Sequence, residues 1–487
     1  MNDPRPSKLW NDYDRPHLDL REFITRVEKA GELLRIPRAD WNLEMGTLAE
    51  AVNERANAPA VLFEDVPGYP EGFRALSGST NSMKRLAITL GFPVPSHPLD
   101  VVRAYRDRMK THAPIPPRVV DGGPVLENVL SGSDVDVLKF PVPFLHELDG
   151  GRYIGTDDLV IMRDPEGNWV NCGTYRVMVH HAKRVGVWMS PGKHGRQIRE
   201  KYFRRGEPCP VLISLGHDPL LFLAGGNEIR FGLSEYDYAA GHRGAPYDVI
   251  ESELYRLPMP AHAEIVLEGV MHPGETRPEG PFGEFTGYYA GGRSDQPVVR
   301  VERIYHRNEP ILSLACPMVP PSDFSYSKCV MKAGMIWDEV ERAGLSGVKG
   351  VWVHEAGCAR MFNVIAISQA YAGHAKQAAL LAASCQSGSY LGRFVVVVDD
   401  DVDPTKLDEV IWAMCTRCDP AQDIDIVRRA WSGPLEPRLS KGTTWNSRGL
   451  IDACRPYEML GEFPPVVKAS PELREQVLRK FKSQLKA

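Results

Sequence analysis

Two glutamates lie close together in the stretch Glu279-Gly280-Pro281-Phe282-Gly283-Glu284, and such a pair can carry out acid–base chemistry. A straight strand would point residues five positions apart to opposite faces, but the two glycines and Pro281 favour a bent loop. A bent loop can turn both carboxylates toward one cavity. Two carboxyls in one pocket repel when both are ionised, so the pKa of one rises and that group can donate a proton. A surface turn with two solvated glutamates is the alternative that spacing alone leaves open.

An arginine that could pair with a carboxylate ends a second stretch, Asn171-Cys172-Gly173-Thr174-Tyr175-Arg176. This stretch directly follows an expected strand. The guanidinium of Arg176 can form a forked pair with a carboxylate of the protein or of a substrate. A purely structural ion pair is the alternative.

Two shorter stretches could approach a phosphate. Lys193-His194-Gly195 lies at the entry of an expected helix, and a helix N-terminus attracts anions. Ala224-Gly225-Gly226-Asn227 contains two glycines, which allow the backbone to come close to a ligand. Neither stretch matches the G-x-G-x-x-G fingerprint or a P-loop, so each is a weak signal by itself.

The first region of the chain, residues 1–125, is expected to be an α/β domain. Leu20, Phe23, Ile24 and Val27 follow the helical i, i+3, i+4, i+7 pattern before Gly31. Short strands are expected at residues 33–36 and 60–63, and the proline-rich stretch 114–118 closes the domain.

The middle region, residues 126–310, contains many short β-like runs separated by glycine and proline, which predicts a compact sheet or barrel. One helix is expected near residues 196–203. The strands are expected at residues 158–163, 169–172, 186–189, 211–215, 263–269 and 298–305.

Residues 311–345 are expected to connect two domains, with a linker helix at 326–343. Residues 346–460 alternate strand and helix patterns, which predicts a second α/β domain. Its run Phe394 to Val398 is apolar throughout, as in a strand buried on both faces. Residues 461–487 form a tail with a helix that begins at Ser470-Pro471. Its apolar stripe of Leu473, Val477 and Phe481 is expected to dock on another subunit or domain.

Composition excludes several classes of protein. The 487 residues carry a formal net charge of −5, so no basic excess exists for binding nucleic acid. No apolar run is long enough for a membrane span, and the N-terminal residues lack the apolar core of a secretory signal. Nine scattered cysteines do not form a disulfide framework, so we expect a reduced, cytoplasmic protein. Cys415 and Cys418 are interpreted as two half-buried side chains on a helix.

Taken in order, these stretches resemble the UbiD-like decarboxylases, which use prenylated flavin mononucleotide (prenylated FMN). The likeness covers roughly residues 125–455, and a looser likeness appears near residues 20–36. It adds Ser234-Glu235-Tyr236-Asp237-Tyr238, Ala263 to Gly269, Thr286-Gly287-Tyr288-Tyr289, Tyr371 to Lys376 and Asp399 to Val402 to the stretches above.

The resemblance implies a central split β-barrel domain that binds the flavin, flanked by α/β domains. It implies that Asn171, His194 and Glu235 hold a divalent ion, manganese or magnesium, against the cofactor phosphate. Oxygen ligands with one imidazole suit these metals. A potassium ion is expected near residues 224–227, where glycines replace the small hydroxyl residues of relatives. The cofactor contacts that the resemblance implies are Asn171, Thr174, Tyr175, Arg176, Lys193, His194, Gly225, Gly226, Asn227 and Glu235.

The implied reaction is the reversible removal of carbon dioxide from an aromatic or heteroaromatic acid. Glu284 would protonate the resulting carbon, while Arg176 and Glu279 orient the substrate carboxylate and tune Glu284. A flavin prenyltransferase would supply the cofactor, and the expected assembly is a homodimer or homohexamer. Two alternatives stay open: an oxidoreductase that binds plain FMN, and a non-catalytic subunit of a carboxylase complex.

The identity of the acid is not determined by these motifs. Residues 316–321 and 439–445 are expected to line the substrate pocket, and Arg438 or Lys441 could contact a second polar group on the ring. An exposed basic pair is the alternative for these two residues. Hydroxybenzoic, phthalic-type and heteroaromatic acids, or a thioester of one, all remain open.

Overall fold

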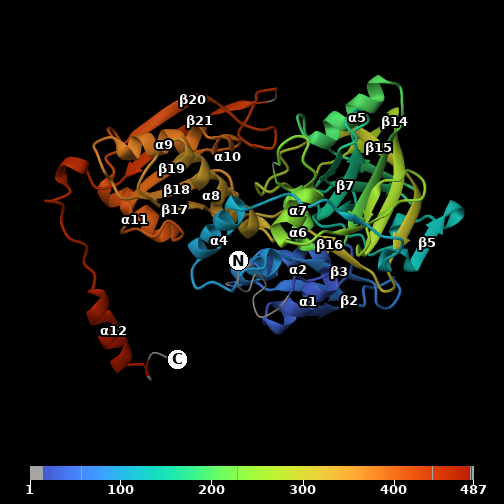
Figure 1. Cartoon of the computed structure of the whole chain (residues 1–487), viewed down its shortest axis with the longest axis horizontal. Coiled ribbons are helices and arrows are strands. Elements are labelled where there is room, and N and C mark those ends of the chain that lie inside the picture. Colours follow the sequence, from blue (N-terminus) through green and yellow to red (C-terminus); the bar gives the residue numbers. More distant parts are fainter. Residues whose placement is uncertain (1–14, 56, 228, 441, 483, 485–487) are drawn as a thin grey trace, which may run out of the picture.

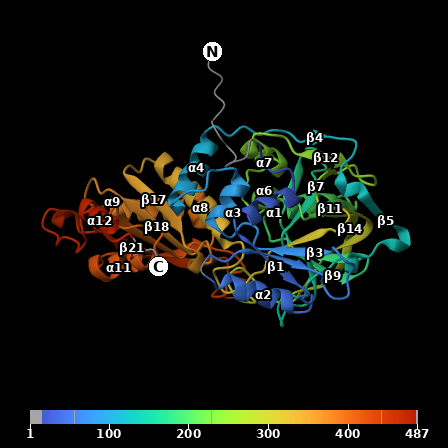
Figure 2. The ribbon, with the colours of Figure 1, turned by 90° about the horizontal axis from the view of Figure 1, so that it is seen from below.

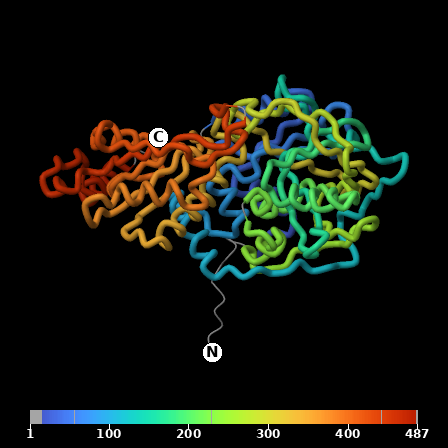
Figure 3. The backbone as a smooth tube through the Cα atoms, turned by 90° about the horizontal axis from the view of Figure 1, so that it is seen from above, coloured from blue at the N-terminus to red at the C-terminus, as the bar shows by residue number. Residues whose placement is uncertain are grey.

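The computed structural model describes residues 15–482 and 484, apart from residues 56, 228 and 441. The expectation for Lys441 therefore lies outside the described residues. The N-terminal and middle domains pack together, and the C-terminal domain lies beside them (Figures 1 and 3). This arrangement agrees with the three α/β and β-rich regions expected from the sequence.

The N-terminal domain is built on a four-stranded sheet of order β1-β2-β3-β16. Its strands β1 and β2 confirm the two runs expected from the sequence. The fourth strand, β16, comes from the segment expected to be only a connector, and all four of its residues are buried. The strands are β1 (Leu33–Pro37), β2 (Ala60–Glu64), β3 (Arg74–Ser77) and β16 (Ile311–Leu314); the helices are α1 (Leu20–Lys29), α2 (Glu44–Asn53), α3 (Met83–Leu90) and α4 (Pro98–Lys110).

The middle domain contains a nine-stranded sheet of order β6-β9-β10-β15-β14-β11-β7-β8, with β5 paired to β15. The sheet curls into half a barrel (Figure 2), as expected. The strand expected at 186–189 begins and ends two residues earlier, at Arg184–Val187. The strands are β5 (Asn128–Ser131), β6 (Tyr153–Gly155), β7 (Asp158–Arg163), β8 (Val170–Gly173), β9 (Val177–His181), β10 (Arg184–Val187), β11 (Cys209–Leu215), β14 (Ile265–Glu279) and β15 (Ser294–His306).

Three helices and a small sheet complete the middle domain. The helices α5 and α7 matter most for the site, because His194 and Glu235 are their first residues. The helices are α5 (His194–Arg204), α6 (Pro219–Gly225) and α7 (Glu235–Arg243), and the small sheet joins β4 (Arg118–Val119), β12 (Asp248–Glu251) and β13 (Pro258–Pro260).

The long antiparallel pair β14 and β15 positions the glutamate stretch. Its register runs from Ile265 opposite His306 to Glu279 opposite Ser294. Glu279 is thus the last residue of a strand, so the expected bent loop begins only at Gly280, where φ is 84°. A positive φ suits glycine, which has no Cβ to clash. The turn carries Glu284 back toward the sheet.

The C-terminal domain has a five-stranded sheet of order β17-β18-β19-β21-β20, whose central strands β18, β19 and β21 are parallel. The valine-rich strand β19 is buried along most of its length, as expected. The strands are β17 (Val348–Val353), β18 (Phe362–Ile367), β19 (Phe394–Asp399), β20 (Ile424–Trp431) and β21 (Trp445–Ala453); the helices are α8 (Ser325–Arg342), α9 (His374–Ser384), α10 (Gln386–Ser389) and α11 (Leu407–Arg417).

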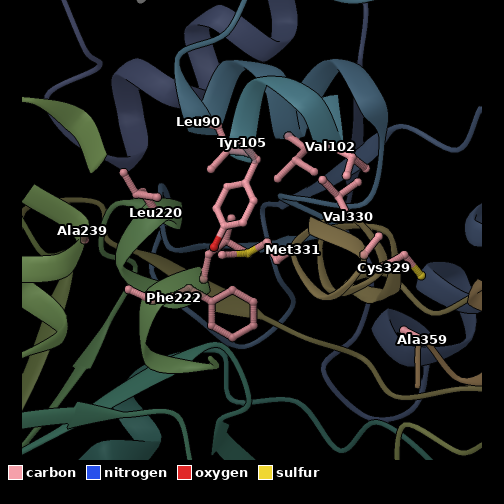
Figure 4. Close-up of a cluster of buried hydrophobic side chains, with 14 of the residues drawn as sticks. Leu90, Val102, Tyr105, Leu220, Phe222, Ala239, Cys329, Val330, Met331 and Ala359 are labelled. Atoms are coloured by element: carbon pink, nitrogen blue, oxygen red, sulfur yellow. The ribbon is translucent and has the colours of Figure 1, made fainter. Parts of the chain in front are cut away.

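Helix α8 joins the C-terminal domain to the other two. Its residues Val330 and Met331 pack beside Tyr105 of α4 and Phe222 of α6 in one apolar cluster (Figure 4). Burial of such a cluster stabilises the contact because it removes apolar surface from water. The packing holds the ends of α6 and α8 close together, next to the site described below.

The tail helix α12 (Pro471–Lys480) begins as expected, because the Ser470 side chain accepts a hydrogen bond from the Leu473 backbone amide. It extends away from the domains (Figure 1), and none of its residues is buried. The stripe of Leu473, Val477 and Phe481 is therefore not docked on this chain's own domains. Among the described helices, none is both long and apolar enough to traverse a lipid bilayer.

Candidate active site

The structure brings Arg176, Glu279 and Glu284 together. Arg176 lies in the short loop between β8 and β9, opposite the end of β14. Its Nε and Nη2 each donate a hydrogen bond of 2.8 Å to the Glu279 carboxylate, and its Nη1 donates to Glu284. Glu279 is fully buried and Glu284 is 8% exposed, so the alternative of two solvated glutamates is wrong.

Aromatic side chains hold this ion pair in place. The Tyr153 hydroxyl donates a hydrogen bond of 2.9 Å to Glu279 Oε1. The guanidinium carbon of Arg176 lies 4.6 Å from the centre of the Trp188 ring, a favourable cation–π contact. Because Tyr153 and the three charged groups are buried, their hydrogen bonds hold the group in one geometry.

Burial raises the pKa of Glu284 to about 7. This value includes the lowering effect of the Arg176 positive charge and the smaller raising effects of the Glu279 and Asp149 negative charges. Glu279 receives both the forked arginine and the tyrosine hydroxyl, whereas Glu284 receives only one arginine N–H. Glu284 is therefore the member of the pair that can carry a proton near neutral pH and donate it.

This pKa predicts how the rate of a reaction in which Glu284 donates a proton depends on pH. A donor must be protonated, and the protonated form of Glu284 dominates below about pH 7 and is lost above it. We expect kcat/KM to fall about tenfold per pH unit on the alkaline side of this value. Steady-state rates measured in buffers of constant ionic strength will test it, and a rate that stays constant to about pH 9 would contradict the role of Glu284 as the acid.

A second polar group is formed by Asn171 and Glu235, with His194 on the same cavity. Asn171 Nδ2 donates a hydrogen bond of 2.9 Å to Glu235 Oε1, and the Cys172 amide donates one of 2.7 Å to Oε2. His194 is half-buried against Trp169, with ring centres 5.3 Å apart. Burial raises the pKa of Glu235 to about 7 and lowers the pKa of His194. Among the described residues, the buried Oδ1 of Asn171 has no hydrogen-bond partner.

Two cavities connect these groups. The larger, of about 490 Å³, is lined by Asn171, His194 and Glu235. The smaller, of about 240 Å³, is lined by Arg176 and Glu284. The two cavities adjoin, because some residues line both of them. The shared residues are Thr174, Ser190, Lys193, Gly226 and Tyr390.

The remaining expected cofactor contacts also line the larger cavity: Thr174, Tyr175, Lys193, Gly225, Gly226 and Asn227. The two glycines have a packing reason as well. A Cβ on Gly225 would lie 2.8 Å from the Cys172 carbonyl oxygen, and one on Gly226 would collide with the Lys328 ammonium. The need for glycine here is therefore decided by protein atoms as well as by a ligand.

The C-terminal domain supplies lining residues that the sequence analysis missed. Arg360, Tyr390, Leu391 and Leu435 line the smaller cavity, and Lys328 of α8 donates a hydrogen bond of 2.7 Å to the Gly226 carbonyl oxygen. No spacing pattern links these residues to the glutamate stretch, so only the domain packing could reveal them.

The expectation that residues 316–321 and 439–445 line the substrate pocket is only partly correct. Pro317 from the segment 316–321 does line the smaller cavity. The described residues of 439–445 line neither cavity, and Leu435 takes that place. Arg438 is exposed and away from both cavities, so its interpretation as a surface residue holds. Cys415 on α11 and Cys418 directly after it are free thiols, but the interpretation as two half-buried helical side chains is wrong: Cys415 is exposed and Cys418 lies just outside the helix.

Comparison with known proteins agrees with this architecture. Three domain models of 3-octaprenyl-4-hydroxybenzoate carboxy-lyase (UbiD) match the chain: the N-terminal domain at residues 24–105, the Rift-related domain at 118–320 and the C-terminal domain at 325–453. The chain is 34% identical over 470 residues to a pyrrole-2-carboxylic acid decarboxylase of Pseudomonas aeruginosa, covering 92% of this chain and 93% of that protein. It is 32% identical over 477 residues to a phenolic acid decarboxylase of Streptomyces sp. strain D7, covering 95% and 97%.

Solved structures show the same fold. The UbiD-class enzyme HmfF from Pelotomaculum thermopropionicum, in complex with FMN, is 30% identical with a TM-score of 0.84, over 95% of this chain and all of that one (100%). An evolved dimeric form of HmfF in complex with prFMN is 28% identical with a TM-score of 0.80, over 94% and 98%. With all three domains matched in order, the chain belongs to the UbiD family of carboxy-lyases.

Proposed function

We propose that this enzyme reversibly decarboxylates an aromatic or heteroaromatic acid with prenylated FMN as its cofactor. The observation that carries the proposal is the buried Arg176–Glu279–Glu284 group at one of two adjoining cavities, with Asn171, His194 and Glu235 at the other. A cofactor with a phosphate at one end and a reactive ring at the other fits two groups of residues that lie in different cavities.

The residues at the phosphate end fit a divalent metal. Asn171 Oδ1 is buried without a partner in the described structure, and the buried Glu235 carboxylate has a raised pKa. A cation would satisfy both, since it accepts the lone pairs of the amide oxygen and stabilises the ionised carboxylate. His194 adds an imidazole whose lowered pKa keeps it neutral for binding. Oxygen ligands with one imidazole favour manganese or magnesium.

The expected potassium ion fits residues 224–227 less well than the divalent ion fits its own site. The Gly226 carbonyl oxygen accepts a hydrogen bond from the Lys328 ammonium, which is itself a monovalent cation. The Gly225 carbonyl oxygen accepts one of 3.2 Å from the Thr174 amide. Two of the backbone oxygens that would hold potassium are thus engaged by the protein.

In the proposed reaction, prenylated FMN would supply an electrophilic centre for the electron pair that remains on the substrate when carbon dioxide leaves. The arginine has five N–H groups, and three of them bind the two glutamates, so two remain to orient the substrate carboxylate. Phe282, Phe285 and Leu391 line the cavity and exclude water, which favours conversion of a charged carboxylate into neutral carbon dioxide. Glu284 then delivers its proton to the ring carbon.

The cellular setting follows from the same proposal. A flavin prenyltransferase must supply the modified cofactor. All nine cysteines lie within the described residues and are free thiols, which favours a reducing compartment, the cytoplasm. The exposed apolar stripe of α12 suits a homodimer or homohexamer, in which a second copy would cover it.

Two alternatives make different predictions about the cofactor. An oxidoreductase would bind plain FMN, and a non-catalytic subunit would bind none. A non-catalytic subunit would have no use for a cavity in which a glutamate with a pKa of about 7 lies beside an arginine. Burying three charged groups costs free energy that a scaffold would not need to spend.

The decisive experiment is mass spectrometry of the cofactor extracted after co-expression with a flavin prenyltransferase. We expect a mass above that of FMN by one five-carbon prenyl unit, with a stoichiometric divalent ion in the same preparation. Carbon dioxide release from a panel of aromatic acids should require this cofactor. Plain FMN would support the oxidoreductase, and no flavin would support the subunit.

A further inference from the structure

The smaller cavity contains more positive charge than the proposed reaction uses. Four of its described lining residues are cationic: Arg176, Lys193, Lys328 and Arg360. Glu284 is the only carboxylate among the described residues that line it. Arg176 is neutralised by the two glutamates, and Lys328 binds the Gly226 carbonyl oxygen. Lys193 also lines the larger cavity, where it is an expected cofactor contact, so Arg360 is the cation of this set that has no assigned role.

Arg360 has no counter-charge within the part of the chain that the structure describes. The structure records no ion pair for it among the described residues, and its only contact of note is with the Phe285 ring, whose centre lies 5.3 Å from the guanidinium carbon. The side chain is half-buried. A partly desolvated guanidinium without an anion is unfavourable, because it has lost water without gaining a partner. An anion that enters the cavity would supply that partner.

The backbone positions Arg360 for this purpose. It follows the 3₁₀ turn Glu355–Gly357, and the two residues before it, Cys358 and Ala359, have φ values of 57° and 54°. Residues with a Cβ seldom adopt this left-handed conformation, and strained backbone is concentrated at functional sites. The turn is held by a 2.7 Å hydrogen bond from the Met361 amide to the Gly357 carbonyl oxygen. Cys358, Ala359 and Arg360 all line the cavity.

Arg360 lies beside the proton-donor group, and it also lines a small cavity next to Gly226 and Asn227. It lines the smaller cavity, with Glu284 and Phe285, and is absent from the lining of the larger cavity that contains Asn171, His194 and Glu235. Phe285 is the residue that follows the proposed proton donor. Because Arg360 shares the smaller cavity with Arg176 and Glu284, an anionic group on a substrate held by Arg176 can reach it.

We propose that Arg360 forms a second anion subsite and that the physiological substrate carries a second acidic group on its ring, such as the second carboxylate of an aromatic dicarboxylic acid. The inference rests on the proposed function. One carboxylate of such a substrate binds Arg176 and reacts, and the other binds Arg360. Because Arg176 belongs to the middle domain and Arg360 to the C-terminal domain, a substrate with two acidic groups also ties the two domains together over the cavity.

The test is isothermal titration of the flavin-loaded enzyme with benzoate and with its three dicarboxylate relatives, phthalate, isophthalate and terephthalate. We expect at least one dicarboxylate to bind roughly tenfold or more tightly than benzoate, since a forked charge-assisted pair contributes at least that factor. Arg360→Gln should reduce the preference to about twofold, and Arg360→Lys should keep part of it. Arg438→Gln is the matched control, because it removes an exposed arginine of the same domain and should leave the preference unchanged.

Three results would overturn the proposal: no dicarboxylate binds more tightly than benzoate, the preference survives Arg360→Gln, or that variant loses its flavin while selectivity stays the same. The last result would assign Arg360 to the cofactor phosphate. Flavin absorbance of each variant measures this directly. Binding needs no turnover, so a wild-type enzyme that shows the preference but releases no carbon dioxide contradicts the proposed function and leaves the subsite intact.

Discussion

Glu284→Gln is expected to lower kcat for decarboxylation by about a hundredfold to ten-thousandfold while the flavin stays bound. Glutamine keeps the size of the side chain and can still face Arg176, but it cannot deliver a proton to carbon. The burial that raises the pKa of Glu284 to about 7 is what makes the glutamate a donor at neutral pH, and the amide has no such property. Carbon dioxide release and flavin absorbance, measured on the same preparation, test both parts of the expectation.

A matched control distinguishes the site from a general effect of charge removal. Glu207 lies in the same domain, after α5, and its side chain is exposed. Glu207→Gln should leave kcat and flavin content unchanged. Loss of flavin from the Glu284→Gln enzyme would show that the residue builds the cofactor site rather than donating the proton.

Arg176→Met should both abolish activity and lower the free energy of unfolding by about 3 to 5 kcal/mol at pH 8. Methionine fills part of the space but leaves Glu279 and Glu284 buried without a positive charge. The loss of unfolding free energy should be smaller at pH 5, which is well below the Glu284 pKa of about 7. Glu284 is then protonated and neutral, so only Glu279 lacks a positive charge beside it. Urea unfolding of the flavin-loaded enzyme at the two pH values measures the difference.

Two variants control for this result. Arg293→Met removes an exposed arginine of the loop between β14 and β15 and should change stability by less than about 0.5 kcal/mol. Arg176→Lys keeps the charge but lacks the fork, so it should recover part of the stability and little of the activity. A stability loss for Arg176→Met that is equal at pH 5 and pH 8 would contradict the electrostatic explanation.

Short sequence patterns predicted much of the fold. The five apolar residues Phe394 to Val398 predicted a strand buried on both faces, and β19 is that strand at the centre of the C-terminal sheet. Ser470-Pro471 began a helix because capping depends on neighbouring residues alone. The pairing of β16 with β3 was missed, because these strands are far apart along the chain and a short apolar run does not reveal its partner.

The sequence by itself determined the chemical groups available: one arginine, two glutamates on a turn, and an asparagine, histidine and glutamate suited to a metal. The tertiary structure decided what those groups can do. The register of β14 and β15 sets Glu279 and Glu284 opposite Arg176, and burial there raises the pKa of one carboxyl to about 7. Only the packing of the C-terminal domain brings Arg360 to the same cavity. Proton affinity and charge pairing depend on distances through space, which residue spacing along a chain does not specify.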